Sequence, residues 1–128
     1  MMKNPYGVIV VMGLLAIFIS LGAACGSVTV SAPNEVHMGD SNFEPSSMTL
    51  QKGRRITLVN DVAMVHIIEN GTWDANGNAR SAKESGAPTV DAQINGHGHQ
   101  ELGPFHTLGT FHLYCTIHPG MKLTIVVK

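Results

Sequence analysis

Near its C-terminus the chain reads Tyr114-Cys115-Thr116-Ile117-His118-Pro119-Gly120-Met121, a short segment between two apolar runs. The run from Leu123 to Lys128 that follows is rich in β-branched residues and predicts a strand, as does the segment Thr110–Cys115 before it. Pro119-Gly120 supplies a tight bend between the two strands. The spacing Cys-x2-His-x2-Met therefore puts a thiol, an imidazole and a thioether on one short loop.

These three side chains are of the types that bind a soft metal ion. A further imidazole, His66, lies upstream in the apolar segment Val65–Glu69. Two His and one Cys in a trigonal set, with a weak axial Met, are the ligands of blue-copper electron-transfer sites. We expect Cys115, His118 and Met121 to bind one copper ion together with His66, whose assignment depends on position and context alone.

Cys115 has two alternative interpretations, an inert buried thiol and a catalytic nucleophile. A buried free cysteine is often inert, and a lone histidine on an apolar strand is usually only packed. The joint occurrence of Cys, His and Met at fixed spacing between two strands favours the metal. A protease-like Cys115–His118 pair is not expected, because no motif places an orienting Asn or Asp and Met121 would be left unexplained. No enzymatic activity is predicted.

The N-terminal segment has the pattern of an export signal. Residues 6–25 are uncharged and mostly apolar, Lys3 precedes them, and Gly22-Ala23-Ala24 ends the run before Cys25. Residues 1–25 are predicted to be a signal peptide, with cleavage before Cys25 and lipidation of Cys25 as in a bacterial lipoprotein. An uncleaved membrane anchor, or a freely secreted form, is the alternative, because about 20 apolar residues span a bilayer.

Export has consequences for the rest of the chain. Cys25 belongs to the leader, so Cys115 has no disulfide partner, and an unpaired thiol in an oxidising compartment favours a ligand role. Without residues 1–25 the chain keeps seven Lys/Arg against nine Asp/Glu, a formal charge of −2, because Lys3 is lost from the total of eight. No basic run exists, so nucleic acid is not an expected partner. The predicted location is the periplasmic or extracellular face, tethered to a membrane.

The remaining pattern predicts an all-β domain. Residues 26–34 are interpreted as a tether and residues 35–128 as one domain. Short strands separated by turns indicate a β-sandwich or barrel. Residues 71–98 form a long loop that is functional, mobile or hides short structure, with a helical turn possible near Ala79–Ser85. Further strands are expected at Val36–Met38, Met48–Leu50 and Ile56–Asn60.

The chain resembles the cupredoxins, close to the short-loop plastocyanin and amicyanin group, from about Ser41 to Lys128. Three segments carry the resemblance: residues 43–60, beginning Phe43-Glu44-Pro45, residues 60–66, and residues 103–121, which contain the ligand loop. The resemblance implies a Greek-key β-sandwich whose copper ligands are His66, Cys115, His118 and Met121. It also implies that the ring edge of His118 reaches the surface inside an apolar patch, for which the candidates are Val62, Ala63, Met64, Ile117 and Pro119.

The chain departs from this family at one informative position. Many members carry Asn or another polar residue after the first ligand histidine, and that side chain ties the two ligand loops together. Here the residue is Ile67, so the side-chain brace is missing and only the backbone can replace it. The reduction potential therefore does not follow from the resemblance.

Five more histidines remain, and they bear on alternative functions. His97-Gly98-His99 could chelate a second metal, but a solvated polar loop is the simpler interpretation. Tyr114 and Thr116 flank Cys115 where a multicopper oxidase has histidines, which excludes a trinuclear cluster. His37, His106 and His112 have no assigned role.

The expected function is single-electron transfer by a monomeric carrier. A cytochrome or an oxidase would be the redox partner. The alternative is a copper protein for storage, delivery or sensing.

Overall fold

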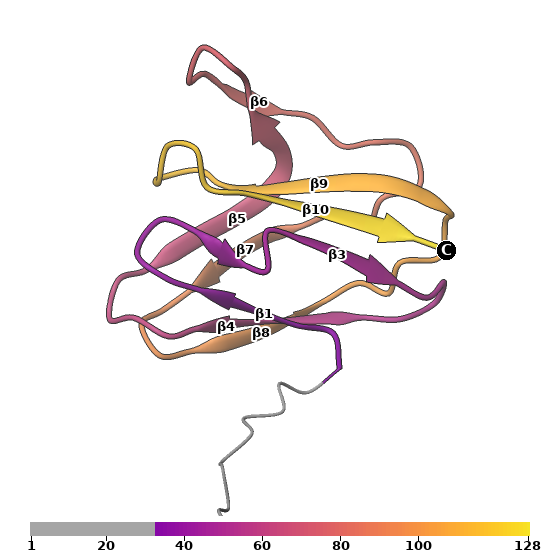
Figure 1. The fold of residues 1–128 in the computed structure, drawn as a ribbon, viewed down its shortest axis with the longest axis horizontal. Coiled ribbons are helices and arrows are strands. Elements are labelled where there is room, and N and C mark those ends of the chain that lie inside the picture. Colours follow the sequence, from indigo (N-terminus) through magenta and orange to yellow (C-terminus); the bar gives the residue numbers. More distant parts are fainter. Residues whose placement is uncertain (1–32) are drawn as a thin grey trace, which may run out of the picture.

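The computed structural model describes residues 33–128, which form a two-layered β structure (Figure 1). The leader, the predicted lipidation at Cys25 and most of the predicted tether lie outside these residues. Within them the strands are β1 (Glu35–Met38), β2 (Phe43–Glu44), β3 (Ser47–Leu50), β4 (Ile56–Asn60), β5 (His66–Trp73), β6 (Ala79–Ser81), β7 (Asp91–Ile94), β8 (His99–Leu102), β9 (Gly109–Cys115) and β10 (Lys122–Val127). In residues 33–128 no helix is long and apolar enough to span a membrane.

The smaller sheet has the strand order β2-β1-β4-β8. β1 runs parallel to β4, with Glu35 opposite Thr57 and Met38 opposite Asn60, while β2 and β8 pair antiparallel at the two edges. β4 alternates strictly between buried and half-buried residues, as a strand with one face on a core must. Because β1 and β4 are parallel, both end at the edge of the sandwich from which the chain turns toward His66.

The larger sheet has the order β3-β10-β9-β5-β6, with β7 paired to β5. β9 and β10 form an antiparallel hairpin in which Tyr114 lies opposite Lys122. β5 lies on the other side of β9, with Ile68 opposite Cys115. The central strand β9 therefore delivers Cys115 next to the beginning of β5.

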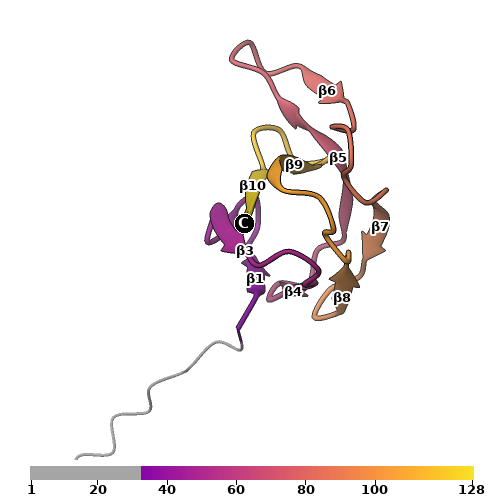
Figure 2. The same ribbon diagram turned by 90° about the vertical axis from the view of Figure 1, so that its right-hand side faces the viewer.

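The inward-facing residues of both sheets meet in one hydrophobic core. Its fully buried members include Leu58, Ile68, Leu113, Leu123 and Ile125. Burying a side chain of this kind stabilises the fold by about 1.5–3 kcal/mol. Figure 2 looks along the strands and shows the sheets enclosing this core, with the β5–β6 hairpin standing out beyond it.

The predicted all-β sandwich is confirmed, although the sequence pattern does not predict β2, β6, β7 or β8 as strands. The expected helical turn near Ala79–Ser85 is wrong, because residues 79–81 form β6 and pair with β5. The predicted loop 71–98 contains β6 and β7, which its Gly- and Asn-rich composition had concealed. β5 also continues to Trp73, past the Asn70-Gly71 pair that was expected to stop it.

Candidate metal centre

The ligand loop connects β9 to β10 and is closed by its own backbone. The N–H of Met121 donates to the carbonyl of His118 at 3.1 Å, and the N–H of Cys115 donates to the carbonyl of Met121 at 3.1 Å. Gly120 has a φ of +82°, a conformation that favours glycine. The Pro-Gly bend predicted from the sequence is thus the turn that brings His118 back toward Cys115.

His66 reaches the same place from the other side of β9. It is the first residue of β5, fully buried, and it follows the loop of residues 61–65. Because Ile68 pairs with Cys115, the imidazole two residues earlier lies beside the end of β9. Pairing of β5 with β9 therefore unites residues that lie 49 positions apart in the chain.

The loop before His66 is held by a buried amide. Asn60 Nδ2 donates to the carbonyls of Met64 at 2.6 Å and Asn95 at 3.0 Å, and its Oδ1 accepts from the N–H of Val62 at 3.1 Å. Asn60 is only 2% exposed, so these bonds are made away from water, where an unpaired amide would be costly. Sequence analysis did not single out Asn60; a polar residue ending an apolar strand was its only signal.

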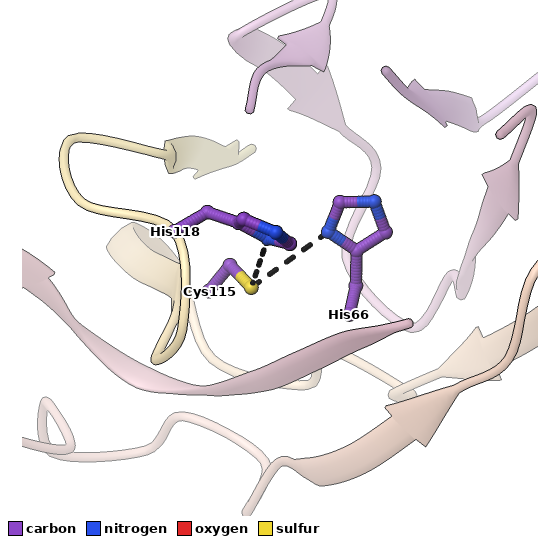
Figure 3. Close-up of side chains that lie close together, drawn as sticks. All are labelled: His66, Cys115 and His118. Carbon is purple, nitrogen blue, oxygen red and sulfur yellow. Dashed lines mark hydrogen bonds between the residues drawn. The ribbon is translucent and has the colours of Figure 1, made fainter. Parts of the chain in front are cut away.

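The donor atoms of His66, Cys115 and His118 converge at the end of the sandwich (Figure 3). Cys115 Sγ lies 3.7 Å from Nδ1 of His66 and 3.3 Å from Nδ1 of His118. All three donors lie within 4.8 Å of one another. Metal bonds of about 2.0 Å to nitrogen and about 2.3 Å to sulfur, at trigonal angles, separate the two atoms by about 3.7 Å. The residues present therefore fit a trigonal metal site.

The surroundings of His66 favour its neutral, metal-binding form. Burial of the imidazole, and then the neighbouring His118, lower the pKa of His66 below its ordinary value of 6.5. The Gly39 backbone and the Asp40 carboxylate oppose this shift only in part. The rings of His66 and His118 are 4.7 Å apart and tilted by 58°, so two imidazolium charges there would repel each other. A cation that accepts both nitrogen lone pairs relieves this conflict.

Met121, the predicted axial ligand, is the last residue of the ligand loop and lies directly before β10. It is 1% exposed and belongs to the hydrophobic core cluster. Its backbone bonds to Cys115 and His118 fix its position relative to both of them. The donor atoms of three predicted ligands thus converge, and the fourth ligand, Met121, is joined to two of them by backbone hydrogen bonds.

The brace that Ile67 lacks in its side chain is supplied by its backbone. The Ile67 carbonyl accepts the N–H of Thr116 at 2.8 Å, which ties the segment after His66 to the residue after Cys115. A second bond comes from Trp73, whose indole Nε1 donates to the Cys115 carbonyl at 3.1 Å. Sequence analysis missed Trp73, and being the single tryptophan of the chain was its only signal.

The other histidines lie outside this centre. In the part of the chain that the structure describes, the residues that could jointly hold a metal are His66, Cys115 and His118. His97 and His99 are exposed. His97 has a φ of +58°, and its backbone N–H donates to the carbonyl of Val62. His112 pairs with Glu84 at 2.6 Å. The second metal site considered for His97 and His99 gains no support.

Apolar side chains surround the centre on the surface. Met64 and Ile117 are each 43% exposed and Val65 is 36% exposed, although all three are large and hydrophobic. Val65 precedes His66 directly, and Ile117 precedes His118, whose own side chain is half-buried. An exposed apolar surface thus covers the same end of the sandwich as the two imidazoles.

Comparison with known proteins agrees with this geometry. Residues 30–128 match the family of copper binding proteins described as the plastocyanin/azurin family. A plastocyanin from Scenedesmus fuscus is 33% identical over 88 residues, which cover 67% of this chain and 86% of that protein.

Two solved structures share the fold. The reduced Cu(I) form of an amicyanin variant at pH 4 has a TM-score of 0.57 and 22% identity, covering 78% of this chain and 87% of that one. A purple cupredoxin from Nitrosopumilus maritimus has a TM-score of 0.54 and 19% identity, covering 73% and 98%. The chain therefore belongs to the plastocyanin/azurin family of copper binding proteins and is a cupredoxin with a single copper ion as its cofactor.

Proposed function

We propose that this chain carries single electrons, with His66, Cys115, His118 and Met121 as the ligands of its copper ion. The observation that carries the proposal is the convergence of one thiol and two imidazole nitrogens within 4.8 Å, from two segments of the sandwich: the β9–β10 loop and the start of β5. Copper bound there would supply a one-electron couple between Cu⁺ and Cu²⁺. The chain is thus a carrier and not an enzyme.

The contribution of the protein is to hold its ligands still. His66 is fixed by β5 and by the hydrogen bonds that Asn60 makes to the loop before it. Cys115 is fixed by β9 and by the hydrogen bond from the Trp73 indole. The tie between Thr116 and Ile67 joins these two supports directly. Ligands held in this way move little when the charge of the metal changes, so little energy is spent on reorganisation during electron transfer.

Electrons would pass through the ring edge of His118 and the surrounding apolar surface. This surface, formed by Met64, Val65 and Ile117, suits a brief encounter, because transient redox complexes bury little area. The partner would be a redox protein such as a cytochrome or an oxidase, met by a monomer of this chain. The formal charge of −2 without the leader would steer such a partner only weakly.

The chain would work outside the cytoplasm, attached to a membrane by its N-terminal segment. The uncharged run of residues 6–25 supports this proposal. The start of β1 lies at the end of the sandwich opposite to the donor cluster, because β1 is parallel to β4 and β4 leads into the loop before His66. Attachment on that side would leave the copper end free for a partner.

The visible spectrum of the copper-loaded chain tests the central claim. One copper per chain with intense absorption from a thiolate–copper bond, bleached and restored by one electron, is the expected result. A pale spectrum, or several tightly bound copper ions, would instead favour storage, delivery or sensing.

A matched pair of surface variants tests the route of the electron. I117K places a charge on the apolar surface beside His118, whereas L108K places the same charge at the opposite end, on a residue that is 61% exposed. In self-exchange two copies meet through the same surface, so I117K brings like charges together. We expect I117K to slow self-exchange by roughly tenfold or more and L108K to leave it nearly unchanged. Equal effects of the two variants would refute the proposed route.

A further inference from the structure

The end of the sandwich opposite to the metal centre gathers basic side chains. β10 begins directly after the ligand loop and runs away from it, and β3 runs parallel to β10, so both strands finish at this opposite end (Figure 1). Four exposed basic residues lie there: Lys52, Arg54 and Arg55 in the turn between β3 and β4, and Lys128 after β10. These four residues, the basic end, are more than half of the seven Lys and Arg in residues 33–128, since Lys3 is the eighth in the chain.

Backbone hydrogen bonds hold the basic end in one shape. The N–H of Lys52 donates to the carbonyl of Lys128 at 2.8 Å, which joins the turn to the last strand. The N–H of Arg54 donates to the carbonyl of Gln51 at 3.1 Å, and its own carbonyl accepts the N–H of the buried Phe105 at 2.9 Å. The fold therefore brings positive charges together from distant parts of the chain.

Little of this positive charge is neutralised by other side chains. Arg55 lies 3.7 Å from the Glu101 carboxylate, but the two side chains are 47% and 60% exposed, and such a surface pair is weak. The salt bridges found within residues 33–128 do not involve the other three basic residues. Glu35, at the start of β1, is a second carboxylate near this end. Four positive charges against two negative ones leave a charge of +2.

The end with the metal centre carries acidic side chains instead. Asp61 opens the loop before His66, Asp40 lies in the turn after β1, and both are exposed. The two segments lie together, because the N–H of Asp61 donates to the carbonyl of Met38 at 3.1 Å. Lys122, at the start of β10, offsets one of these charges. The domain thus has a positive and a negative end, and an anionic surface would turn the positive end toward itself.

The chain enters the described domain beside the basic end. Pro33 and Asn34 line one surface groove together with Arg54. Residues 26–33 span at most about 30 Å even when fully extended, because a residue adds at most about 3.6 Å. The uncharged run of residues 6–25, which we propose holds the chain to a membrane, would therefore keep the basic end close to the lipid headgroups.

We propose that the basic end docks on the anionic lipid headgroups of the membrane to which the chain is attached. This inference rests on the proposed attachment through the N-terminal segment. Lipid phosphate oxygens accept hydrogen bonds from guanidinium and ammonium groups, and a basic patch is a common second signal beside one apolar anchor. The short tether raises the local concentration of headgroups, so individually weak contacts suffice.

Docking at the basic end would orient the copper site. The ligand loop and the exposed apolar surface around it lie at the opposite end of the sandwich, so they would face away from the bilayer. The acidic side chains at the metal end would be repelled by the same headgroups, which favours this orientation over the reverse one. A redox partner would then meet the copper end without competition from the membrane.

Acetylation of lysines tests the proposal on the copper-loaded full chain incubated with vesicles. Lys52 and Lys128 report on the basic end, whereas Lys83 and Lys122 are exposed lysines elsewhere on the same molecule. Mass spectrometry gives the rate at each lysine. Vesicles of phosphatidylcholine with about one third phosphatidylglycerol should slow acetylation at the basic end about fivefold relative to pure phosphatidylcholine, and should change the other two rates little. Salt at about 1 M, which shortens the Debye length to about 3 Å, should abolish this protection.

Two double variants of equal net charge separate the basic end from the total charge. K52Q/R54Q removes two charges from the basic end, and K83Q/K122Q removes two charges elsewhere. A charge near an anionic surface contributes about fivefold to binding, so K52Q/R54Q should weaken docking about 25-fold and expose Lys128 to acetylation. In K83Q/K122Q, Lys52 and Lys128 should stay protected.

Equal rates at the basic end on both kinds of vesicle, equal slowing of all four lysines, or loss of protection in K83Q/K122Q would overturn the proposal. Failure of the N-terminal attachment is recognised separately, because the chain would then not float with pure phosphatidylcholine vesicles. The lysine rates on anionic vesicles would still decide whether the basic end binds lipid. Failure of the electron-carrier function shows in the visible spectrum and leaves the acetylation rates unchanged.

Discussion

The ligand loop and strand β5 both build the copper centre, but they do so in different ways. The loop holds Cys115, His118 and Met121 within seven neighbouring residues and closes on itself with two backbone bonds. β5 brings His66 at its start and, after a bend, Trp73 at its end, and both meet Cys115 only because the strand lies beside β9. The loop thus provides three ligands by local spacing. β5 provides the ligand His66 and the hydrogen-bond donor Trp73 by tertiary packing.

Removing the loop's thiol should have the largest effect. C115S replaces the soft thiolate with a hydroxyl that binds copper weakly, so we expect the intense visible band to vanish completely. Absorption spectra of copper-loaded protein measure this result. T116S, which alters the next residue and keeps its backbone bond to Ile67, is the control and should keep the band. Intense absorption in C115S would mean that the loop is not the source of the thiolate ligand.

Removing His66, the ligand that β5 contributes, should weaken copper binding and leave the ligand loop in place. H66G deletes one imidazole and leaves a buried space, so copper should be held at least about 100-fold more weakly, because losing even an outer partner of a ligand costs 10–100-fold. Competition with a chelator measures this affinity. Added imidazole can enter the space and should restore the spectrum in H66G but not in C115S. No rescue, with the fold intact, would argue against His66 as a ligand.

The bend in β5 can be tested by stability alone. G71A drives a Cβ into the Arg80 carbonyl at a φ of +136° and should lower the free energy of unfolding by about 3 kcal/mol. G77A is the matched control on the same hairpin, because its φ is +77° but nothing lies within 4 Å of the new atom. It should cost about 1 kcal/mol. Urea unfolding of the copper-free chain compares the two, and equal costs would show that the bend is not sterically demanding.

Acidity should have the smallest effect, and it acts on the β5 side of the site. The pKa of His66 is lowered in the folded chain, so below pH 6.5 the unfolded chain binds more protons. Stability of the copper-free chain is therefore fully present above pH 6.5 and is lost as the pH falls through the folded-state pKa. Thermal unfolding measured from pH 8 to pH 5 should show this loss of stability as a slope of the unfolding temperature against pH. H66F lacks the titrating group and should show a shallower slope; an identical slope would exclude His66 as the cause.

Several strands and the ligand loop could be predicted from local sequence. The alternation in Ile56–Asn60 predicted β4 correctly to the residue, and the ligand loop was found because its donors lie on neighbouring positions. β6 (Ala79–Ser81) and β7 (Asp91–Ile94) escaped prediction because they are short, hold only one β-branched residue between them and lie in a segment rich in Gly and Asn. Their pairing with β5 supplies what their composition does not.

Local sequence is enough to predict soft-metal chemistry, because Cys115, His118 and Met121 are donors on one short loop whose spacing is set by covalent bonds. Strand pairing is needed to bring His66 beside Cys115, to let the Ile67 backbone bond Thr116 and to place Trp73 on the Cys115 carbonyl. These contacts join residues far apart in the chain, so they depend on strand register and on the bend at Gly71, which no local pattern encodes.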